Sequence, residues 1–213
     1  MENASKALVI AGGVLIGLLL LVLLVYTFRQ WGDAEATKQK EIESQRVGDF
    51  NKSYLSYEKQ ALYGSELLGL VNKMRDYNVS DDIKYNGFEK MSLKVKINGG
   101  TGDLFENNGT YDLEDIYDRI YNTSKSTSII SIENRFSNIT DPQWETLAKA
   151  SSDDQTFQKL CTPQGLNITY SPELQEAAKE YYKYIQFKRK EFRHVDTSFF
   201  SNGRVDTMEF EEK

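Results

Sequence analysis

Hydrophobic residues form one uninterrupted run near the start of the sequence, whereas elsewhere they recur singly among polar positions. The run extends from Ala7 to Phe28 and contains neither a charged residue nor a proline. As a helix rising ~1.5 Å per residue it would be roughly 33 Å long, which is enough to cross the hydrocarbon core of a bilayer. The pattern therefore predicts a transmembrane helix, and residues 1–28 are interpreted as a membrane anchor.

A secretory signal peptide is the alternative interpretation of this run. Signal peptides have an apolar core of about 7–15 residues followed by a small-x-small cleavage site. Here the apolar run is longer, and no Ala-x-Ala pattern follows it. Instead, three aromatic side chains and one cation suit the headgroup level of a bilayer. These expected interfacial anchors are Tyr26, Phe28, Arg29 and Trp31. We therefore expect the helix to be retained.

Small residues recur at four-residue steps in the first half of the predicted span. Gly13 and Gly17 form one such pair, and Ala7 and Ala11 form another. In lipid, helices associate where small residues let their backbones approach closely, so these four positions predict a helix-packing face. This interpretation implies a homo- or hetero-oligomer joined through the membrane helix. The alternative is that glycine is simply common in membrane helices.

After the anchor, helical and strand periods both occur, which predicts an α+β fold. Residues 29–63 are rich in Glu, Lys, Gln and Ala, and they predict a helical stalk or spine that continues the membrane helix. Met91, Leu93, Val95 and Ile97 alternate with polar residues, as in a half-buried strand. Residues 64–213 are interpreted as a small head. Within it, further helices are expected near 65–78, 112–120, 142–148, 157–160 and 172–184, and short strands at 128–132 and 166–170.

The C-terminal part of the head predicts an antiparallel hairpin. Its first strand is expected within 185–195, which is rich in aromatic and β-branched residues. Asn202-Gly203 favours a two-residue type I′ turn, because both residues tolerate positive φ angles. The spacing of Val205, Met208 and Phe210 departs from strict alternation and predicts a bulge near Asp206-Thr207.

Basic residues gather along this hairpin, although the whole chain has a formal net charge of −6. They are Lys188, Arg189, Lys190, Arg193 and Arg204. One interpretation is a docking patch for an acidic neighbour or anionic lipid. The alternative is an ordinary solvated face of a sheet.

Composition and charge argue against several classes of function. An acidic chain is a poor candidate for binding nucleic acid, which calls for a basic patch. The single cysteine, Cys161, excludes an intrachain disulfide framework. The single histidine, His194, makes a histidine-based metal site or a catalytic triad improbable. The acidic residues around 103–118 do not have the spacing of a calcium loop. We therefore expect a non-enzymatic protein with no cofactor and no metal.

Three parts of the sequence resemble a group of small membrane-anchored proteins of Gram-positive bacteria that have no assigned activity. The likeness rests on MENASKAL at 1–8, on FNKSYLSY and GSELLGLVNKMRDYN within 50–78, and on FKRKEF with SNGRVDTMEFEE within 187–212. The layout of an apolar helix, a helical spine and a head with antiparallel strands also resembles type IV pilins and pseudopilins. The chain departs from those proteins in having no cysteine pair in the head.

These features predict a membrane-anchored, non-enzymatic structural or assembly subunit, such as a pilin-like component of a surface filament or secretion apparatus. The alternative is a membrane-tethered ligand-binding or sensor module, which requires a concave apolar pocket in the head. Counting basic residues on the two sides of the span slightly favours a cytoplasmic head. The short N-terminal segment and the resemblance favour the opposite, so we expect a single-pass protein of the cell membrane with an extracytoplasmic head.

Overall fold

The computed structural model describes residues 2–85 and 88–213, apart from the side chains at positions 2, 4, 5, 82 and 85. Met1 and the pair Asn86-Gly87 lie outside the described residues. The chain forms two compact units, and the boundary between them falls between Phe50 and Asn51. The second unit, Asn51–Lys213, therefore contains the predicted head, 64–213, together with residues that were predicted as stalk.

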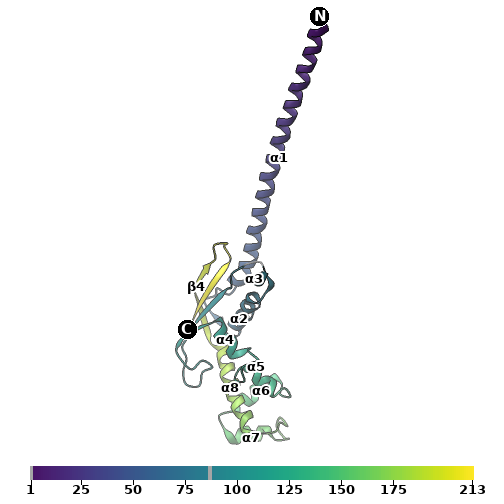
Figure 1. Ribbon diagram of the computed structural model, residues 1–213. Coiled ribbons are helices and arrows are strands. Elements are labelled where there is room, and N and C mark those ends of the chain that lie inside the picture. The colour runs from purple at the N-terminus through teal and green to yellow at the C-terminus, as the bar shows by residue number, and fades with distance from the viewer. Residues whose placement is uncertain (1, 86–87) are drawn as a thin grey trace. The chain divides into compact units, whose positions relative to one another are not determined.

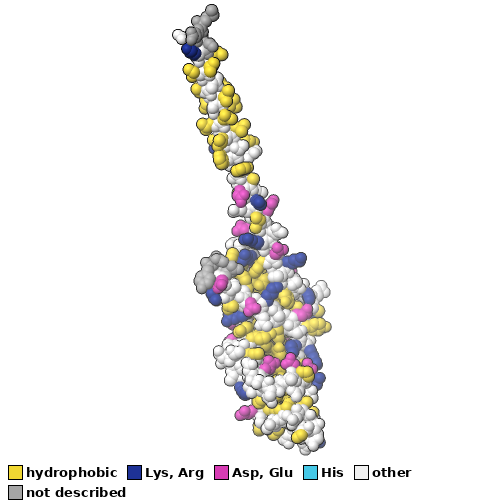
Figure 2. All heavy atoms as spheres, turned by 90° about the vertical axis from the view of Figure 1, so that its right-hand side faces the viewer, with side chains coloured by type: hydrophobic (Ala, Val, Ile, Leu, Met, Phe, Trp, Pro, Cys, Tyr) yellow, Lys and Arg dark blue, Asp and Glu magenta, His cyan; other side chains and the backbone are white. Residues whose placement is uncertain are grey.

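The first unit is helical throughout its described length. Helix α1 comprises Glu2–Leu55, so only its last turn belongs to the second unit. It contains a window with a mean hydropathy of 3.2, and it is long and apolar enough to cross a membrane. Figure 2 shows hydrophobic side chains covering this part of the helix, with charged side chains following further along. The predicted span is thus confirmed as a helix, which continues into the predicted stalk as far as Leu55.

A five-stranded mixed sheet forms one part of the head. Its strands are β1 (Leu62–Tyr63), β2 (Ser92–Ile97), β3 (Gly109–Asp112), β4 (Glu191–Phe199) and β5 (Val205–Glu212), in the order β1-β4-β5-β2-β3. Neighbouring strands are antiparallel except for β2 and β5, which pair in parallel with Val95 opposite Phe210. The predicted strand at 91–97 is confirmed as β2, and its alternating burial places Leu93, Val95 and Ile97 in the core. The predicted α+β class holds.

Several helices of the head begin at polar capping residues. They are α2 (Gly64–Asn78), α3 (Asp81–Tyr85), α4 (Leu113–Ile120), α5 (Ile129–Arg135), α6 (Asp141–Ala150), α7 (Asp154–Cys161) and α8 (Pro172–Arg189). Asp112 and Asp115 form a capping box at α4, and Ser171 accepts a hydrogen bond from the Leu174 amide at α8. Proline in the first turn of α8 fits because its missing N–H would have no partner there.

Two hydrophobic clusters share helix α8. In Figure 1, α5, α6 and α7 gather at the end of the head away from the β4–β5 hairpin, and α8 runs between the two ends. Near the sheet, the ring of Phe187 lies 5.3 Å from Phe105 and 5.6 Å from Phe192. At the other end, Tyr181 stacks on Trp144 with ring centroids 5.1 Å apart. Burial of these rings, together with the aliphatic residues of the core, stabilises the head.

Two short predicted strands are wrong, and backbone geometry explains both. Residues 128–132 begin helix α5, because Ser128 caps it through the Ser131 amide and Ile129 and Ile132 are buried three residues apart. Residues 166–170 form a loop that hydrogen-bonds back to the end of α7. There Asn167 has a φ of 53°, which a strand does not accommodate.

The C-terminal hairpin is confirmed, but its start and its turn differ from the prediction. Helix α8 continues to Arg189, beyond the expected end near 184, so β4 begins only at Glu191. The type I′ turn is wrong: among the described turn residues only Gly203 has a positive φ, of 81°. Instead, the Phe200 amide donates to the Arg204 carbonyl and the Gly203 amide donates to the Phe200 carbonyl. These two hydrogen bonds close a three-residue loop. The predicted bulge is confirmed, because Asp206 and Thr207 together oppose the single residue between Thr197 and Phe199.

The last turn of α1 is attached to the head by side-chain hydrogen bonds. Asn51 Nδ2 donates to the Gly203 carbonyl at 2.8 Å, and its Oδ1 accepts from the Val205 amide at 3.0 Å. Lys73 Nζ donates to the Ser53 carbonyl at 2.6 Å and lies over the ring of Tyr54. Burial, together with the nearby Tyr77, Asp76 and Tyr57, raises the pKa of Tyr54 to about 12.

Candidate functional site

A groove of about 700 Å³ lies between helix α8 and the segment formed by α5 and the loop before it. Its size is within the range of small-molecule binding sites. Its lining combines three apolar, two hydroxyl and five charged side chains. These are Ile132, Pro172, Ala177, Ser126, Thr127, Arg119, Arg135, Glu173, Glu176 and Glu180.

Helix α8 supplies one complete wall because its lining residues share a face. Pro172, Glu173, Glu176, Ala177 and Glu180 recur at steps of three and four residues, which places them along one side of a helix. The short side chain of Ala177 lies between Glu173 and Glu180, which are one helical turn before and after it. The carboxylates of this wall are therefore arranged in a row beside an apolar strip.

The opposite wall is held by a dense set of hydrogen bonds. Ser128, which is fully buried, donates through Oγ to the carbonyls of Asn122 and Lys125 at 2.8 and 2.9 Å. Arg135 Nη2 donates to the Ser126 carbonyl at 3.1 Å. Because the loop's carbonyls are satisfied internally, its backbone is positioned without a ligand.

Arg119, which lines the groove, joins three segments of the head. Its Nε donates to the Leu104 carbonyl at 3.2 Å, its Nη1 donates to the Thr127 carbonyl at 2.6 Å, and its Nη2 is paired with Glu180. Lys183 Nζ also contacts Glu180, at 2.7 Å. Burial alone would raise the pKa of Glu180, but the hydrogen bonds from Lys183 and Arg119 outweigh it and lower that pKa. Glu180 is thus ionised and neutralised within the protein.

The remaining charges at the groove are less engaged. Among the ion pairs of the described residues, none includes Arg135 or Glu173. Glu176 pairs with Lys179 at the exposed surface, where such pairs contribute little. The groove therefore offers a guanidinium on its α5 wall and carboxylates on its α8 wall, together with the apolar side chains of Ile132 and Ala177.

A second set of polar side chains, which the sequence did not single out, is formed by Glu133 of α5 with Tyr181 and Tyr184 of α8. Burial raises the pKa of the Glu133 carboxyl, and the nearby Asp141 raises it further, whereas the Tyr181 hydroxyl and Lys188 oppose the shift. Burial also raises the pKa of Tyr181 and of Tyr184. These groups lack a nucleophile paired with a base, so the arrangement is consistent with a packed polar network.

The basic residues predicted as a docking patch are distributed over different elements. Lys188 and Arg189 end helix α8, and Lys190 follows it and pairs with Glu212 at 2.8 Å and Asp103 at 3.4 Å. Arg193 on β4 pairs with Glu211 at 2.7 Å. The Arg204 guanidinium lies 3.9 Å from the centre of the Phe88 ring. Internal partners thus neutralise Lys190 and Arg193, which leaves less free positive charge than the sequence suggested.

The residues predicted to act in the membrane all lie on α1. Nothing lies within 4 Å of where a Cβ would be at Gly13 or Gly17, so that side of the helix is open. The midpoints of the Ala7–Ala11 and Gly13–Gly17 pairs are six residues apart, which is about 120° around an ideal helix. The two pairs therefore lie on different faces and could not serve one contact together. The expected anchors, Tyr26, Phe28, Arg29 and Trp31, are all exposed on the helix.

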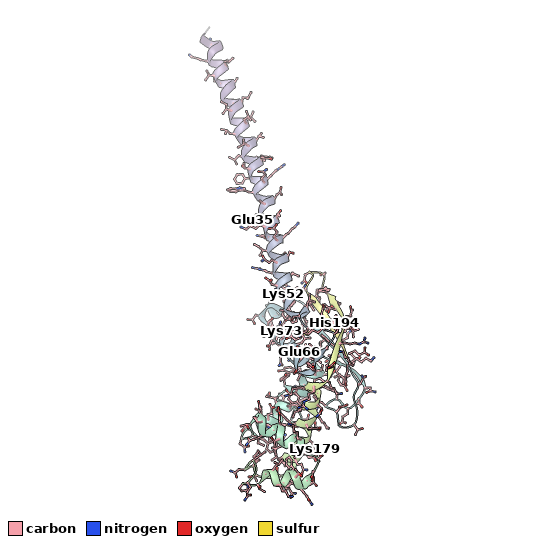
Figure 3. The ribbon with its side chains drawn as sticks, turned by 180° about the vertical axis from the view of Figure 1, so that it is seen from behind. Glu35, Lys52, Glu66, Lys73, Lys179 and His194 are labelled. Atoms are coloured by element: carbon pink, nitrogen blue, oxygen red, sulfur yellow. The ribbon has the colours of Figure 1, made fainter. Side chains whose placement is uncertain are left out.

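The single histidine lies at the sheet end of the head, away from the groove. His194 Nε2 is 2.8 Å from Thr197 Oγ1 and 3.7 Å from a carboxylate oxygen of Glu58. In Figure 3, His194 and Lys179 lie toward opposite ends of the head, and Lys179 is the partner of the groove residue Glu176. Within residues 2–85 and 88–213, no three His, Cys, Asp or Glu side chains are grouped to hold a metal ion.

Sequence reasoning missed the groove because it assigned the α5 segment to a strand. The signal that could have found it is Ser128 followed by Ile129 and Ile132, a capping residue before a helical step. No protein-family model, curated protein or solved structure matches this chain. The likeness to small membrane-anchored proteins of Gram-positive bacteria, and to pilins, therefore stays a prediction.

Proposed function

We propose that this protein is a membrane-tethered binding module, in which α1 anchors the chain in a bilayer and the head captures a ligand in the groove between α5 and α8. The observation that carries the proposal is the groove itself, whose two positioned walls each contribute an apolar side chain, Ile132 from α5 and Ala177 from α8. A pre-formed hollow of this kind is the usual setting for ligand binding.

The tether is supported by the length and apolar character of α1. Exposed aliphatic side chains cover the helix from Leu8 to Val25. Transfer of this apolar surface from water into a bilayer would be favourable. The proposal places the head on the extracytoplasmic side of a bacterial cell membrane. Digestion of intact cells with an external protease should then remove the head, whereas an intact head after digestion would place it in the cytoplasm.

A methyl-labelled full-length chain in lipid nanodiscs provides the test of binding. We expect compounds from a fragment library to shift the NMR signals of the Ile132 and Ala177 methyl groups, but not that of Ile97 in the sheet. Replacing Ala177→Phe would fill the groove and abolish these shifts, whereas Ala61→Phe at an exposed site would preserve them. A library that leaves both groove methyls unshifted would refute the proposal.

An assembly subunit, pilin-like or otherwise, is the second candidate, and the spacing of the small residues Gly13 and Gly17 on α1 favours it. Because the alanine and glycine pairs lie on different faces, disulfide crosslinking in membranes discriminates between them. The free thiol Cys161 is buried, and Cys161→Ser removes it from the background. Gly13→Cys or Gly17→Cys should then give crosslinked dimers and Ala11→Cys should not, while equal crosslinking at all three would indicate random collision.

A further inference from the structure

We infer that the ligand of the groove is a short peptide with free termini, bound with its carboxylate at Arg135 and its ammonium group at the α8 carboxylates. This inference rests on the proposed function, because it names the ligand class of the same groove. The argument depends on which charges at the groove are already neutralised and which are not.

Arg135 is the guanidinium available to a ligand. Arg119 makes three contacts, to Leu104, Thr127 and Glu180, and so has little capacity left. Arg135 donates to one carbonyl, that of Ser126, through Nη2. A guanidinium has five N–H donors in a planar fork that matches a carboxylate, so most of the capacity of Arg135 remains. The loop carbonyl at Ser126 holds it on the wall of the groove.

The α8 wall carries the opposite charge. Glu173 has no cation among the ion pairs of the described residues, and Glu176 has only the exposed Lys179. Glu180, which is paired with Arg119 and Lys183, adds no free charge. An ammonium group near Glu173 and Glu176 would gain charge-assisted hydrogen bonds. A ligand that satisfies both walls must therefore carry one negative and one positive end.

The apolar lining and the volume distinguish a peptide from a free amino acid. Ile132 on the α5 wall and Pro172 and Ala177 on the α8 wall give the groove apolar surface, which suits an aliphatic side chain. The hollow of about 700 Å³ lies within the range of sites that hold ligands of about drug size. A peptide of roughly two to four residues fills such a volume, so we assign the groove to short peptides.

Titration of the full-length chain in nanodiscs with the tripeptide alanyl-leucyl-alanine tests the assignment. We expect saturable shifts of the Ile132 and Ala177 methyl signals. Amidation of the peptide's carboxyl group, or acetylation of its amino group, should each weaken binding about tenfold or more, since a lost charged contact is of that size. Arg135→Gln should weaken the free peptide similarly but change the amidated peptide little. Glu173→Gln should likewise weaken the free peptide but change the affinity for the acetylated peptide little.

One control variant and a comparison of fragment with peptide binding separate this inference from the proposed function. Arg189→Gln removes an exposed cation at the far end of α8 and should leave the affinity unchanged. If fragments bind the groove but the tripeptide does not, or if capping its ends does not weaken it, the peptide assignment is wrong and the binding module survives. If neither fragments nor peptide shift the groove signals, both proposals fail.

Discussion

Replacement of Arg119 by methionine is the most direct probe of how the groove is built. The guanidinium joins the Leu104 carbonyl, the Thr127 carbonyl and the Glu180 carboxylate, which belong to three separate segments. Methionine keeps a similar aliphatic stem and a similar length but provides no donor. Arg119→Met therefore removes three hydrogen bonds without opening a large cavity.

The expected magnitude follows from the contacts. A hydrogen bond from a charged donor contributes ~1.5–3 kcal/mol, but such contributions are not additive within one network. The side chains of Arg119 and Glu180 are 23% and 30% exposed, and Lys183 continues to neutralise Glu180 in the variant. We therefore expect a loss of about 3 kcal/mol in the free energy of unfolding at pH 7, about 1 kcal/mol for each acceptor.

The pH dependence separates the carboxylate from the two carbonyls. Hydrogen bonds from Lys183 and Arg119 lower the pKa of Glu180 in the folded protein, despite the opposing effect of burial. A lowered carboxyl pKa stabilises the fold above the unfolded value, about 4.3, and this stabilisation is lost as the pH falls through the folded value. The difference between wild type and Arg119→Met should thus shrink from about 3 kcal/mol at pH 7 toward about 2 kcal/mol at an acidic pH below the folded pKa of Glu180.

Urea unfolding of the full-length chain in detergent measures this difference. Trp144 is buried in the head and reports its unfolding, provided that the exposed Trp31 is replaced by phenylalanine in all samples. Arg135→Met, which loses a single hydrogen bond to Ser126, is the matched control and should cost less than about 1 kcal/mol. A loss below about 1 kcal/mol for Arg119→Met, or one that is equal at both pH values, would refute this account.

Three further predictions concern other parts of the head. Asn78 donates to and accepts from the backbone of Met91, both at 2.8 Å in a buried site, so Asn78→Ala should lower the free energy of unfolding by about 3 kcal/mol in the same assay. Burial raises the pKa of Glu133, so the ionised side chain destabilises the fold increasingly as the pH rises above about 4.3. Glu133→Gln should therefore leave the chain as stable or up to about 1 kcal/mol more stable at pH 7. Its free energy of unfolding should also vary less between pH 4 and pH 7 than that of the wild type. Asn51→Ala removes both hydrogen bonds to the hairpin turn, and hydrogen exchange should accelerate at the Val205 amide while that of Val95 in β2 stays unchanged.

The span, the strand at 91–97 and most helix starts could be predicted from the sequence because their causes are local. A charge-free run such as Ala7 to Phe28 requires no tertiary partner to be recognised. Alternation in β2 reflects the period of the strand itself, and Ser171-Pro172 satisfies the first turn of α8 with neighbouring atoms. The bulge in β5 was also predictable, since it was already present in the spacing of Val205, Met208 and Phe210.

The tertiary structure decided what local patterns leave ambiguous. A short apolar segment such as 128–132 fits a strand or a helix equally well until its neighbours select one. Here Ile129 and Ile132 are buried on α5, which packs against α8 and α4. The same holds for 185–189, which suited a strand by composition but continues α8 because Phe187 packs against Phe105 and Phe192.

The groove depends on the same decision. Its walls, α5 with the loop before it and α8, are distant in the sequence, and the availability of Arg135 and Glu173 depends on Arg119 and Glu180 neutralising each other. Which charges cancel is a property of distances between residues far apart in the chain. The sequence by itself therefore determined the long apolar helix, the fold class and the local caps, whereas only packing in three dimensions determined the hollow and the charges that face it.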